Sequence, residues 1–269
     1  MVVFPNAKVN LGLNVVDKRE DGYHDIETIF YAVDWKDALE ILPSKEFQFS
    51  IIGKDIPGDL EDNLVVKVYR AFQDQYKVGG CKIVLDKHIP MGAGLGGGSA
   101  DAAFCATALN SFFQLNLSLE HLEDLVRPLG ADCAFFVRNS PVYGFGKGDQ
   151  FQEVVCDLSN YSWLFIHPEV HVSTSHAYAG LTPRRPDVNV KEVLALPVES
   201  WKDRLVNDFE ETVFEQFPVI RDIKNACYQA GATFSLMSGS GSTVFALFKG
   251  DIPSNFVNEM RAKYTVHEA

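Results

Sequence analysis

The stretch "PMGAGLGGGSADAA", residues 90–103, decides the fold class of this chain. Five of the seven residues from Gly92 to Gly98 are glycine, and small residues suited to a helix follow them. Glycine loses more backbone freedom on folding than any other residue, so a run this dense indicates that something approaches the backbone closely. Successive N–H groups in such a loop, together with the positive end of the following helix, suit an anion such as a phosphate group.

Two better-known phosphate loops do not fit this stretch. Gly92, Gly94 and Gly97 match the dinucleotide pattern GxGxxG. That loop follows a strand directly, however, and an acidic residue ends the next strand about 20 residues later. Here residues 87–91 intervene, and residues 116–121 read as the start of a helix. A P-loop is excluded because no Lys-[ST] pair follows the glycines. A flexible surface loop without a ligand is the remaining alternative to a phosphate cradle of another kind.

The bulk composition is that of an acidic globular protein. The chain has 269 residues, 46% of them hydrophobic, with a formal net charge of −12 and a sequence pI of about 5.0. Nucleic-acid binding needs a basic face, so nucleic acid is not expected as a partner. No apolar run reaches the ~20 residues that span a bilayer, and the first residues carry no leader pattern. We therefore expect no membrane association.

The cysteines indicate a reducing compartment. They are odd in number and widely spaced, without CxxC pairs: Cys81, Cys105, Cys133, Cys156 and Cys227. This spacing argues against a disulfide framework and against a zinc site. We expect a cytoplasmic protein.

The N-terminal residues 7–16 alternate strictly between apolar and polar side chains. Val9, Leu11, Leu13 and Val15 fall on one face. The alternation predicts a half-buried strand whose polar face carries both Lys8 and Asn10.

The rest of the chain mixes helices and strands without a regular βαβα order, which favours an α+β fold. Strands are predicted over 81–86 and 162–174, and a strand–turn–strand over 234–250. Helices are predicted from residue 64, after Asp62 or Asn63, from Ser99 to about Phe113, from Ser118 to Leu125, and over 208–232 with a break near Pro218.

Three motifs in a fixed order resemble the GHMP kinase superfamily, which includes galactokinase, homoserine kinase and mevalonate kinase. They are "PNAKVNLGL" (5–13), the glycine stretch (90–103) and "MSGSGSTVF" (237–245). The stretches "DGYHDIET" (21–28), "EDNL" (61–64) and "LGADCAFF" (129–136) resemble one branch of that superfamily. That branch belongs to the non-mevalonate isoprenoid pathway and phosphorylates the 2-hydroxyl of a methylerythritol moiety linked to cytidine diphosphate.

The resemblance implies a two-domain α+β architecture. Residues 1–155 would form the N-terminal ATP-binding domain, similar to domain 2 of ribosomal protein S5. Residues 156–269 would form a ferredoxin-like C-terminal domain.

The resemblance also implies two catalytic residues, Lys8 and Asp132. An ordinary aspartate has a pKa near 4, too low to deprotonate an alcohol beforehand. Asp132 would orient the hydroxyl and accept its proton late in the transfer, while Lys8 would stabilise the developing alkoxide. Taken singly, Asp132 reads as a turn residue and Lys8 as part of a solvated strand face. The three motifs together favour the catalytic roles.

The same resemblance assigns the binding residues. ATP would contact Asn63, Lys87, Pro90, Met91, Gly92, Ala93, Gly94, Leu95, Gly96, Gly97, Gly98, Ser99 and Ala100. The second substrate would contact Asn10, Tyr23, His24, Thr174, Tyr178, Ser238, Gly239 and Ser240. A helix cap is the alternative role for Asn63, a surface position for Lys87, and packing in a strand-like region for Tyr178. ATP would enter as its Mg²⁺ complex, held on the protein side by Ser99, and no protein metal site is expected.

Two alternatives remain open at this point. One is another GHMP kinase that acts on homoserine, mevalonate or a sugar. The other is a relative that binds nucleotides but has lost catalysis. In each case the partners are small molecules, and the chain would be a monomer or a homodimer.

Overall fold

The computed structural model describes all 269 residues and divides into two compact units. Unit 1 consists of Met1–Ala7, Asp34–Met91 and Gly96–Ser140, and unit 2 of Lys8–Val33, Gly92–Leu95 and Pro141–Ala269. Both units are therefore discontinuous in sequence, and the glycine run is divided between them. The domain boundary at residues 155 and 156 stays a prediction.

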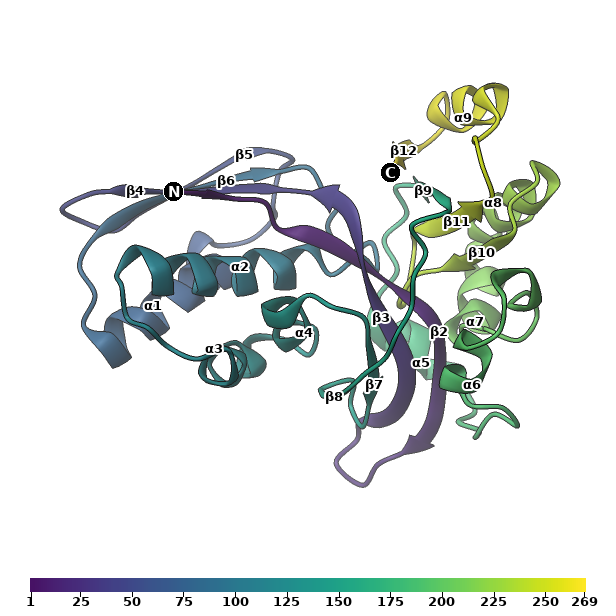
Figure 1. The fold of residues 1–269 in the computed structure, drawn as a ribbon, viewed down its shortest axis with the longest axis horizontal. Coiled ribbons are helices and arrows are strands. Elements are labelled where there is room, and N and C mark those ends of the chain that lie inside the picture. Colours follow the sequence, from purple (N-terminus) through teal and green to yellow (C-terminus); the bar gives the residue numbers. More distant parts are fainter. The chain divides into compact units, whose positions relative to one another are not determined.

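Unit 1 is a sheet covered by helices on one face (Figure 1). The strand order is β1 (Val2–Val3), β4 (Ala38–Pro43), β6 (Cys81–Lys87) and β5 (Gln48–Gly53). The helices are α1 (Leu64–Tyr76), α2 (Gly97–Phe112), α3 (Leu119–Val126) and α4 (Cys133–Arg138), with 3₁₀ turns η1 (Leu60–Asp62) and η2 (Arg127–Leu129). Alternate residues of β6, beginning with Cys81, point into the core that these helices share with the sheet.

The helix starts in unit 1 follow side-chain capping in two of three predicted cases. Asn63 accepts a hydrogen bond from the N–H of Val65 at 2.9 Å and begins α1. Ser118 accepts one from His121 at 3.3 Å and begins α3. Helix α2 differs, because it begins at Gly97, two residues before the predicted Ser99. Gly96 precedes it with φ +69° and no side chain caps it.

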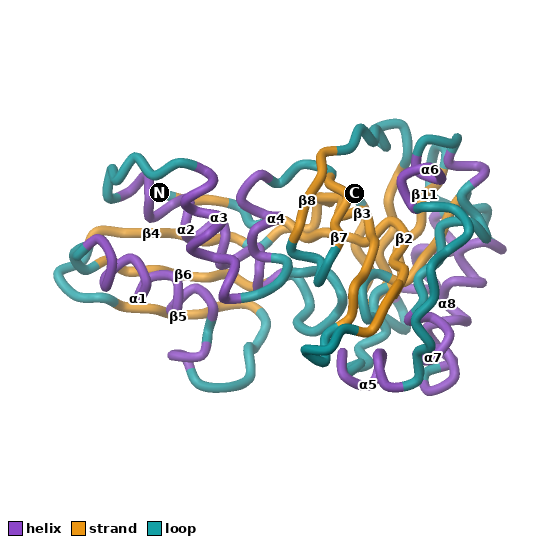
Figure 2. The backbone as a smooth tube through the Cα atoms, turned by 90° about the horizontal axis from the view of Figure 1, so that it is seen from below, coloured by secondary structure: helices purple, strands orange, loops and turns teal.

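Unit 2 contains two four-stranded sheets. The first has the order β2 (Asn6–Lys18), β3 (His24–Lys36), β7 (Val142–Phe145) and β8 (Gln150–Glu153), side by side in Figure 2. The second has the order β10 (Phe234–Met237), β11 (Val244–Phe248), β9 (Ser162–His167) and β12 (Thr265–Glu268). The first residues of β2 and the last of β3 belong to unit 1.

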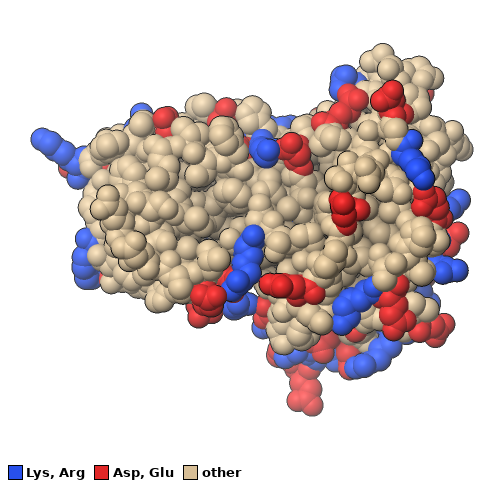
Figure 3. Space-filling view, in the orientation of Figure 1, with Lys and Arg blue, Asp and Glu red and all other residues tan.

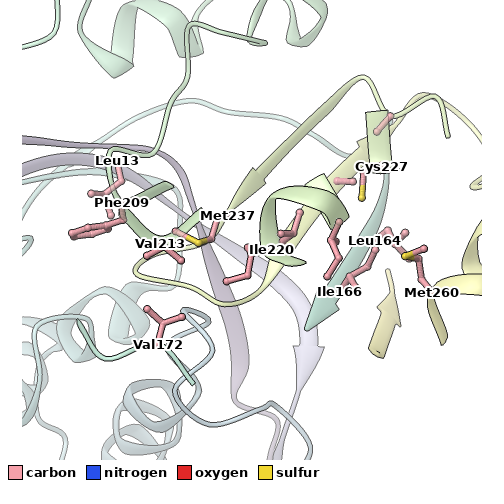
Figure 4. Packing of buried hydrophobic residues seen from close by; sticks show 14 of the residues in the cluster. Leu13, Leu164, Ile166, Val172, Phe209, Val213, Ile220, Cys227, Met237 and Met260 are labelled. Carbon is pink, nitrogen blue, oxygen red and sulfur yellow. The ribbon is translucent and has the colours of Figure 1, made fainter. Parts of the chain in front are cut away.

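The helices of unit 2 follow one another in its second half. They are α5 (Thr174–Ala179), α6 (Val190–Leu194), α7 (Phe209–Gln216), α8 (Pro218–Gln229) and α9 (Ser254–Arg261), with a 3₁₀ turn η3 (Val198–Ser200). The predicted break at Pro218 is confirmed, since the proline occupies the first position of α8. Figure 4 shows Ile220 of α8 in the same buried cluster as Ile166 of β9, Phe209 of α7 and Met260 of α9.

Strand β2 corrects one prediction. Its residues are buried on both faces as far as Val15, so it is not a half-buried strand. The polar face is covered as well, and Lys8 is 4% exposed while Asn10 is 2% exposed. β2 is the edge strand of its sheet, so its place in the sheet does not explain this burial. Alternation in the sequence does not distinguish a polar face that is solvated from one that other elements cover.

Strand β9 corrects the prediction for residues 162–174. The predicted strand over 162–174 ends at His167, because Pro168 lacks the N–H that would continue the ladder. Glu169 then adopts φ +58°. The chain begins helix α5 at Thr174, so Tyr178 lies on a helix rather than in a strand-like region.

Charged side chains are mixed on the face drawn in Figure 3, where Lys and Arg lie among Asp and Glu. Lys8 and Lys87 are exceptions to surface placement, at 4% and 1% exposed. No helix of the structure is both long enough and apolar enough to cross a membrane.

Candidate active site

The first half of the glycine run is fixed by backbone contacts within unit 2. The carbonyl of Leu95 accepts a hydrogen bond from the N–H of Lys8 at 2.9 Å, and that of Ala93 accepts one from Thr243 at 3.2 Å. The hydroxyl of Ser238 donates to the carbonyl of Gly94 at 2.8 Å. At Gly94 (φ +78°) a Cβ atom would lie 2.0 Å from the Ser238 carbonyl oxygen. Residue 94 must therefore be glycine for the loop to lie against the turn at residues 238–243.

Asn207 binds the backbone of the turn at residues 238–243, although the sequence analysis did not identify it. The Asn207 side-chain amide donates to the carbonyls of Met237 and Gly239, each at 2.8 Å. Its oxygen accepts from the N–H of Phe209 at 3.0 Å, at the start of α7. The backbone of the neighbouring residues pairs with β2 through Leu13. Asn207 thus joins the turn to the strand that carries Lys8.

The second half of the run begins helix α2 in unit 1. No acidic residue and no side-chain cap occupy its first turn, so the N–H groups and the positive helix end are left for a ligand anion. Gly98 in this turn lines a cavity of about 190 Å³ together with Asn63, Asp101 and Met91. The remaining lining is mainly apolar, with two further carboxylates: Ile51, Ile56, Pro57, Gly58, Asp59, Leu60, Asp62 and Leu64. A mainly apolar cavity beside a helix N-terminus suits the base and phosphates of a nucleotide.

Lys87 is not a surface residue. Its ammonium is buried between the carboxylates of Asp37 and Asp101, with a distance of 2.7 Å to Asp101. Asp37 also accepts from the N–H groups of His88 and Ile89, at 2.5 and 2.8 Å. The cluster therefore fixes the segment that leads into the glycine run. The ATP contact predicted for Lys87 stays a prediction.

Asp101 is the carboxylate of this cluster whose pKa is raised. It is 2% exposed, and its Oδ1 has no hydrogen-bond partner. Burial raises the pKa of Asp101 to about 7; the Lys87 ammonium opposes this shift, and the carboxylate of Asp37 adds to it. Two carboxylates thus share one buried ammonium at the wall of the cavity.

Asp132 lies at the start of α4, and α4 packs against α2 within unit 1. It is half-buried. The neighbouring Cys133 thiol is hydrogen-bonded to the hydroxyl of Ser99, and a Cβ on Gly130 would lie 3.5 Å from the same hydroxyl. The segment that carries Asp132 is therefore next to the first turn of α2.

Lys8 and Asn10 lie on the same side of β2, as predicted. The Lys8 ammonium donates to Asn10 Oδ1 at 2.7 Å. The Asn10 amide donates to Thr28 Oγ1 at 3.0 Å, and the Thr28 hydroxyl donates to the carbonyl of Gly12 at 2.5 Å. The ring of Phe30 lies 5.3 Å from the Lys8 ammonium, measured to its centroid. Thr28 was not predicted, because strand pairing and not sequence spacing brings it to Asn10.

Four of the eight predicted second-substrate residues form two pairs in unit 2. The rings of His24 and Tyr178 stack at 4.6 Å between centroids and 16° between planes. The hydroxyls of Thr174 and Ser240 lie 3.2 Å apart. Tyr23 stands outside these pairs: it is 61% exposed, and the Lys147 ammonium lies 4.9 Å from its ring.

Comparison with known proteins decides the family. The model for the N-terminal domain of GHMP kinases matches residues 63–140, and the model for the C-terminal domain matches residues 191–266. A curated protein of Bacteroides thetaiotaomicron, named 4-diphosphocytidyl-2-C-methyl-D-erythritol kinase, is 49% identical over 259 residues, which is 94% of each chain. The chain belongs to the GHMP kinase family.

Within this family of GHMP kinases, the similarity is to one branch. A protein of Parabacteroides distasonis with the same name is 49% identical over 93% of this chain and 92% of its own. A crystal structure of 4-(cytidine 5'-diphospho)-2C-methyl-D-erythritol kinase covers 100% of this chain and 98% of its own, with a TM-score of 0.85 and 30% identity. A mevalonate kinase structure, at 14% identity and a TM-score of 0.76, shares the fold alone. The predicted two-domain GHMP kinase fold is confirmed.

The contact between Gly94 and Ser238 gives the first testable prediction. Gly94→Ala should lower the free energy of unfolding by about 2–4 kcal/mol, because the new Cβ meets backbone and the residue keeps a positive φ. Gly98→Ala is the matched control, since nothing lies within 4 Å of its Cβ. Alanine in a helix turn should there be neutral or stabilising by about 0.5–1 kcal/mol. Urea unfolding measures both, and equal losses would contradict the prediction.

The buried carboxyl gives the second prediction. The folded pKa of Asp101 is above its ordinary value of 3.8, so the stability that its proton supplies is lost as pH rises from about 4 to about 7. The amide introduced by Asp101→Asn carries no charge at any pH. The free energy of unfolding of Asp101→Asn relative to the wild type should therefore increase by about 2–3 kcal/mol between pH 5 and pH 8. A difference that does not change with pH in urea unfolding would contradict this.

Proposed function

We propose that this protein transfers the γ-phosphoryl group of ATP to the 2-hydroxyl of 4-diphosphocytidyl-2-C-methyl-D-erythritol. The observation that carries the proposal is the 49% identity, over 94% of the chain, to a relative of that name. The cavity at the start of α2 and the buried ammonium of Lys8 support it. The reaction would be one step of the non-mevalonate route to isoprenoid precursors.

Phosphoryl transfer is mainly a matter of positioning and charge stabilisation. We propose that the base of ATP occupies the apolar cavity beside Asn63 and Met91. Its phosphates would then meet the uncapped N–H groups of Gly97 and Gly98 at the positive end of α2. The helix end would offset phosphate charge in a protein whose net charge is −12.

Mg²⁺ would arrive as part of the MgATP substrate. No group of three or more His, Cys, Asp or Glu side chains is arranged to hold a metal ion. We therefore propose that phosphate oxygens and water bind most of the ion, and that the Ser99 hydroxyl is its contact with the protein. The ion would neutralise charge on the transferred group.

For the acceptor, we propose that Asp132 orients the 2-hydroxyl and takes its proton as the new P–O bond forms. The Lys8 ammonium, held by Asn10, would stabilise the negative charge that develops on the hydroxyl oxygen. The stacked rings of His24 and Tyr178 would bind the cytosine, with Tyr178 as the stacking platform and the His24 ring nitrogens as polar partners. Tyr23 would add a further aromatic face, and Thr174 and Ser240 would contact the polyol.

We also propose a cytoplasmic location, and the state of the cysteines supports it. All five cysteines are free thiols. Burial raises the pKa of Cys81 and Cys133 to about 11, which keeps these thiols protonated and unreactive.

Product formation tests the function. The purified protein is incubated with MgATP and 4-diphosphocytidyl-2-C-methyl-D-erythritol, and the new phosphomonoester is followed by ³¹P NMR. A resonance that depends on this acceptor, and that cytidine nucleotides suppress by competition, supports the proposal. Turnover of mevalonate or homoserine instead would contradict the substrate and leave the kinase fold in place.

Asp132→Asn tests the proposed mechanism. We expect kcat to fall at least 100-fold, because an amide cannot accept the proton, while the Kd for ATP changes less than about threefold. Asp124→Asn on the exposed surface of α3 is the matched control and should leave kcat unchanged. Stopped assays give kcat, and nucleotide titration gives Kd. A normal kcat for Asp132→Asn would overturn the role of Asp132.

A further inference from the structure

Four groups of unit 2 form a chain of hydrogen bonds that ends at the Lys8 ammonium. The Thr28 hydroxyl donates to the Gly12 carbonyl at 2.5 Å, the Asn10 amide donates to Thr28 at 3.0 Å, and Lys8 donates to Asn10 at 2.7 Å. The family motif contains Lys8, Asn10 and Gly12. Thr28 lies on the neighbouring strand β3 and is 0% exposed.

The Gly12 carbonyl, at the start of this chain of hydrogen bonds, determines which group donates and which accepts at every later bond. A backbone carbonyl can only accept, and a hydroxyl has one proton to donate. Because Thr28 gives that proton to Gly12, it turns its lone pairs toward Asn10. Asn10 must then present its NH₂ group to Thr28 and its carbonyl oxygen to Lys8. The orientation of the Asn10 amide, which places an acceptor against the ammonium, therefore depends on Thr28.

The backbone sets the position of the first acceptor. Gly12 has φ +75°, and a Cβ there would lie 3.1 Å from Leu205 and 3.2 Å from Val190. Glycine takes this conformation without steric cost. The Gly12 carbonyl is thus aimed by β2 itself, and water does not compete for it, since Thr28 and Asn10 are buried.

We propose that Thr28 is a positioning residue for phosphoryl transfer: acting through Asn10, it fixes where the Lys8 ammonium lies. Because Thr28 is 0% exposed, the proposal gives it no direct contact with ATP or with the acceptor. The inference rests on the proposed function, in which Lys8 stabilises the charge that develops on the acceptor oxygen. A buried ammonium gains from a partner only in a fixed geometry, so a freely rotating Asn10 amide would displace it or turn an N–H group against it.

The test compares two substitutions at residue 28. Thr28→Val keeps the branched shape but removes the hydroxyl, and we expect kcat to fall 10- to 100-fold while the KM for ATP changes less than twofold. Thr28→Ser restores the hydroxyl and should recover kcat to within about threefold of the wild type. A normal kcat for Thr28→Val, or an equal loss for Thr28→Ser, would overturn the proposal.

A matched control separates positioning from stability. Ser235 is also 0% exposed and donates its hydroxyl to the carbonyl of Phe245 at 2.9 Å. Ser235→Ala therefore also removes a buried hydroxyl from a backbone carbonyl. We expect both Thr28→Val and Ser235→Ala to lower Tm, but Ser235→Ala to keep kcat when assayed well below its Tm. An equal fall in kcat for the two variants would show that lost stability alone explains the effect.

A double-mutant cycle tests the route through Asn10. In an Asn10→Ala background the chain is already cut, so adding Thr28→Val should lower kcat by less than twofold. In a Ser235→Ala background the full loss should remain. Independent, multiplicative losses for Asn10→Ala and Thr28→Val would refute the transmission through Asn10.

Lys8→Ala keeps this inference distinct from the proposed function. If Lys8→Ala abolishes turnover but Thr28→Val is normal, the positioning role fails and the function stands. If Lys8→Ala turns over normally, the proposed role of Lys8 fails, and the positioning role fails with it. If the wild type forms no product with the cytidine-linked acceptor, the proposed substrate itself is wrong.

Discussion

The close approach between the glycine loop and the turn at residues 238–243 is the constraint on which unit 2 depends. Three hydrogen bonds hold residues 93–95: one from the backbone of Lys8, one from the Ser238 hydroxyl and one from the backbone of Thr243. At Gly94, the Ser238 carbonyl leaves no room for a side chain. Because Lys8 is itself a partner of the loop, the position of the candidate catalytic strand and that of the loop are fixed together. Asn207 extends the same bonding to α7.

Each unit buries a lysine whose ammonium is hydrogen-bonded to side chains of the same unit. In unit 1 the Lys87 ammonium has two carboxylates, Asp37 and Asp101; burial raises the pKa of Asp101, and the Asp37 carboxylate adds to the shift. In unit 2 the Lys8 ammonium donates to the amide oxygen of Asn10. The Lys87 ammonium and its two carboxylates are buried together, which suits a structural role. The Asn10 amide orients the Lys8 ammonium, and a fixed orientation is what the proposed role of Lys8 in phosphoryl transfer requires.

Much of the fold could be predicted from local signals. Asn63 and Ser118 begin helices because their side chains reach the N–H groups of the next turn, and Pro218 separates α7 from α8. These effects depend only on residues close in sequence. The burial of β2 on both faces could not be predicted, since it depends on what covers the polar face. The end of β9 at His167 was missed although Pro168 signalled it.

In the candidate site, too, local motifs identified some residues, and residues that act over long distances in sequence were missed. The motifs identified Lys8, Asn10 and the turn at Ser238, and the structure joins each to a neighbour in unit 2. Asp37, Thr28 and Asn207 were not identified as site residues, because each acts on a residue at least 16 positions away in sequence. Thr28 ends the stretch 21–28, but nothing in that stretch shows that strand pairing brings it to Asn10. Residues that touch a ligand are constrained by the ligand, and the constraint is visible as a motif. Residues that position them are constrained only by the fold.

The glycine run shows both kinds of constraint within a few residues. Gly94 is required by the protein, since the Ser238 carbonyl occupies the space of its side chain, and Gly97 is crowded by Ile89 at 2.9 Å. Gly98 has nothing within 4 Å of its Cβ position, and it lines the cavity at the start of α2. In a helix, alanine would be preferred at such an open position by about 0.5–1 kcal/mol. The open space beside the Gly98 backbone is where we propose that the ATP phosphates bind, so at Gly98 the constraint would come from the ligand and at Gly94 it comes from the protein.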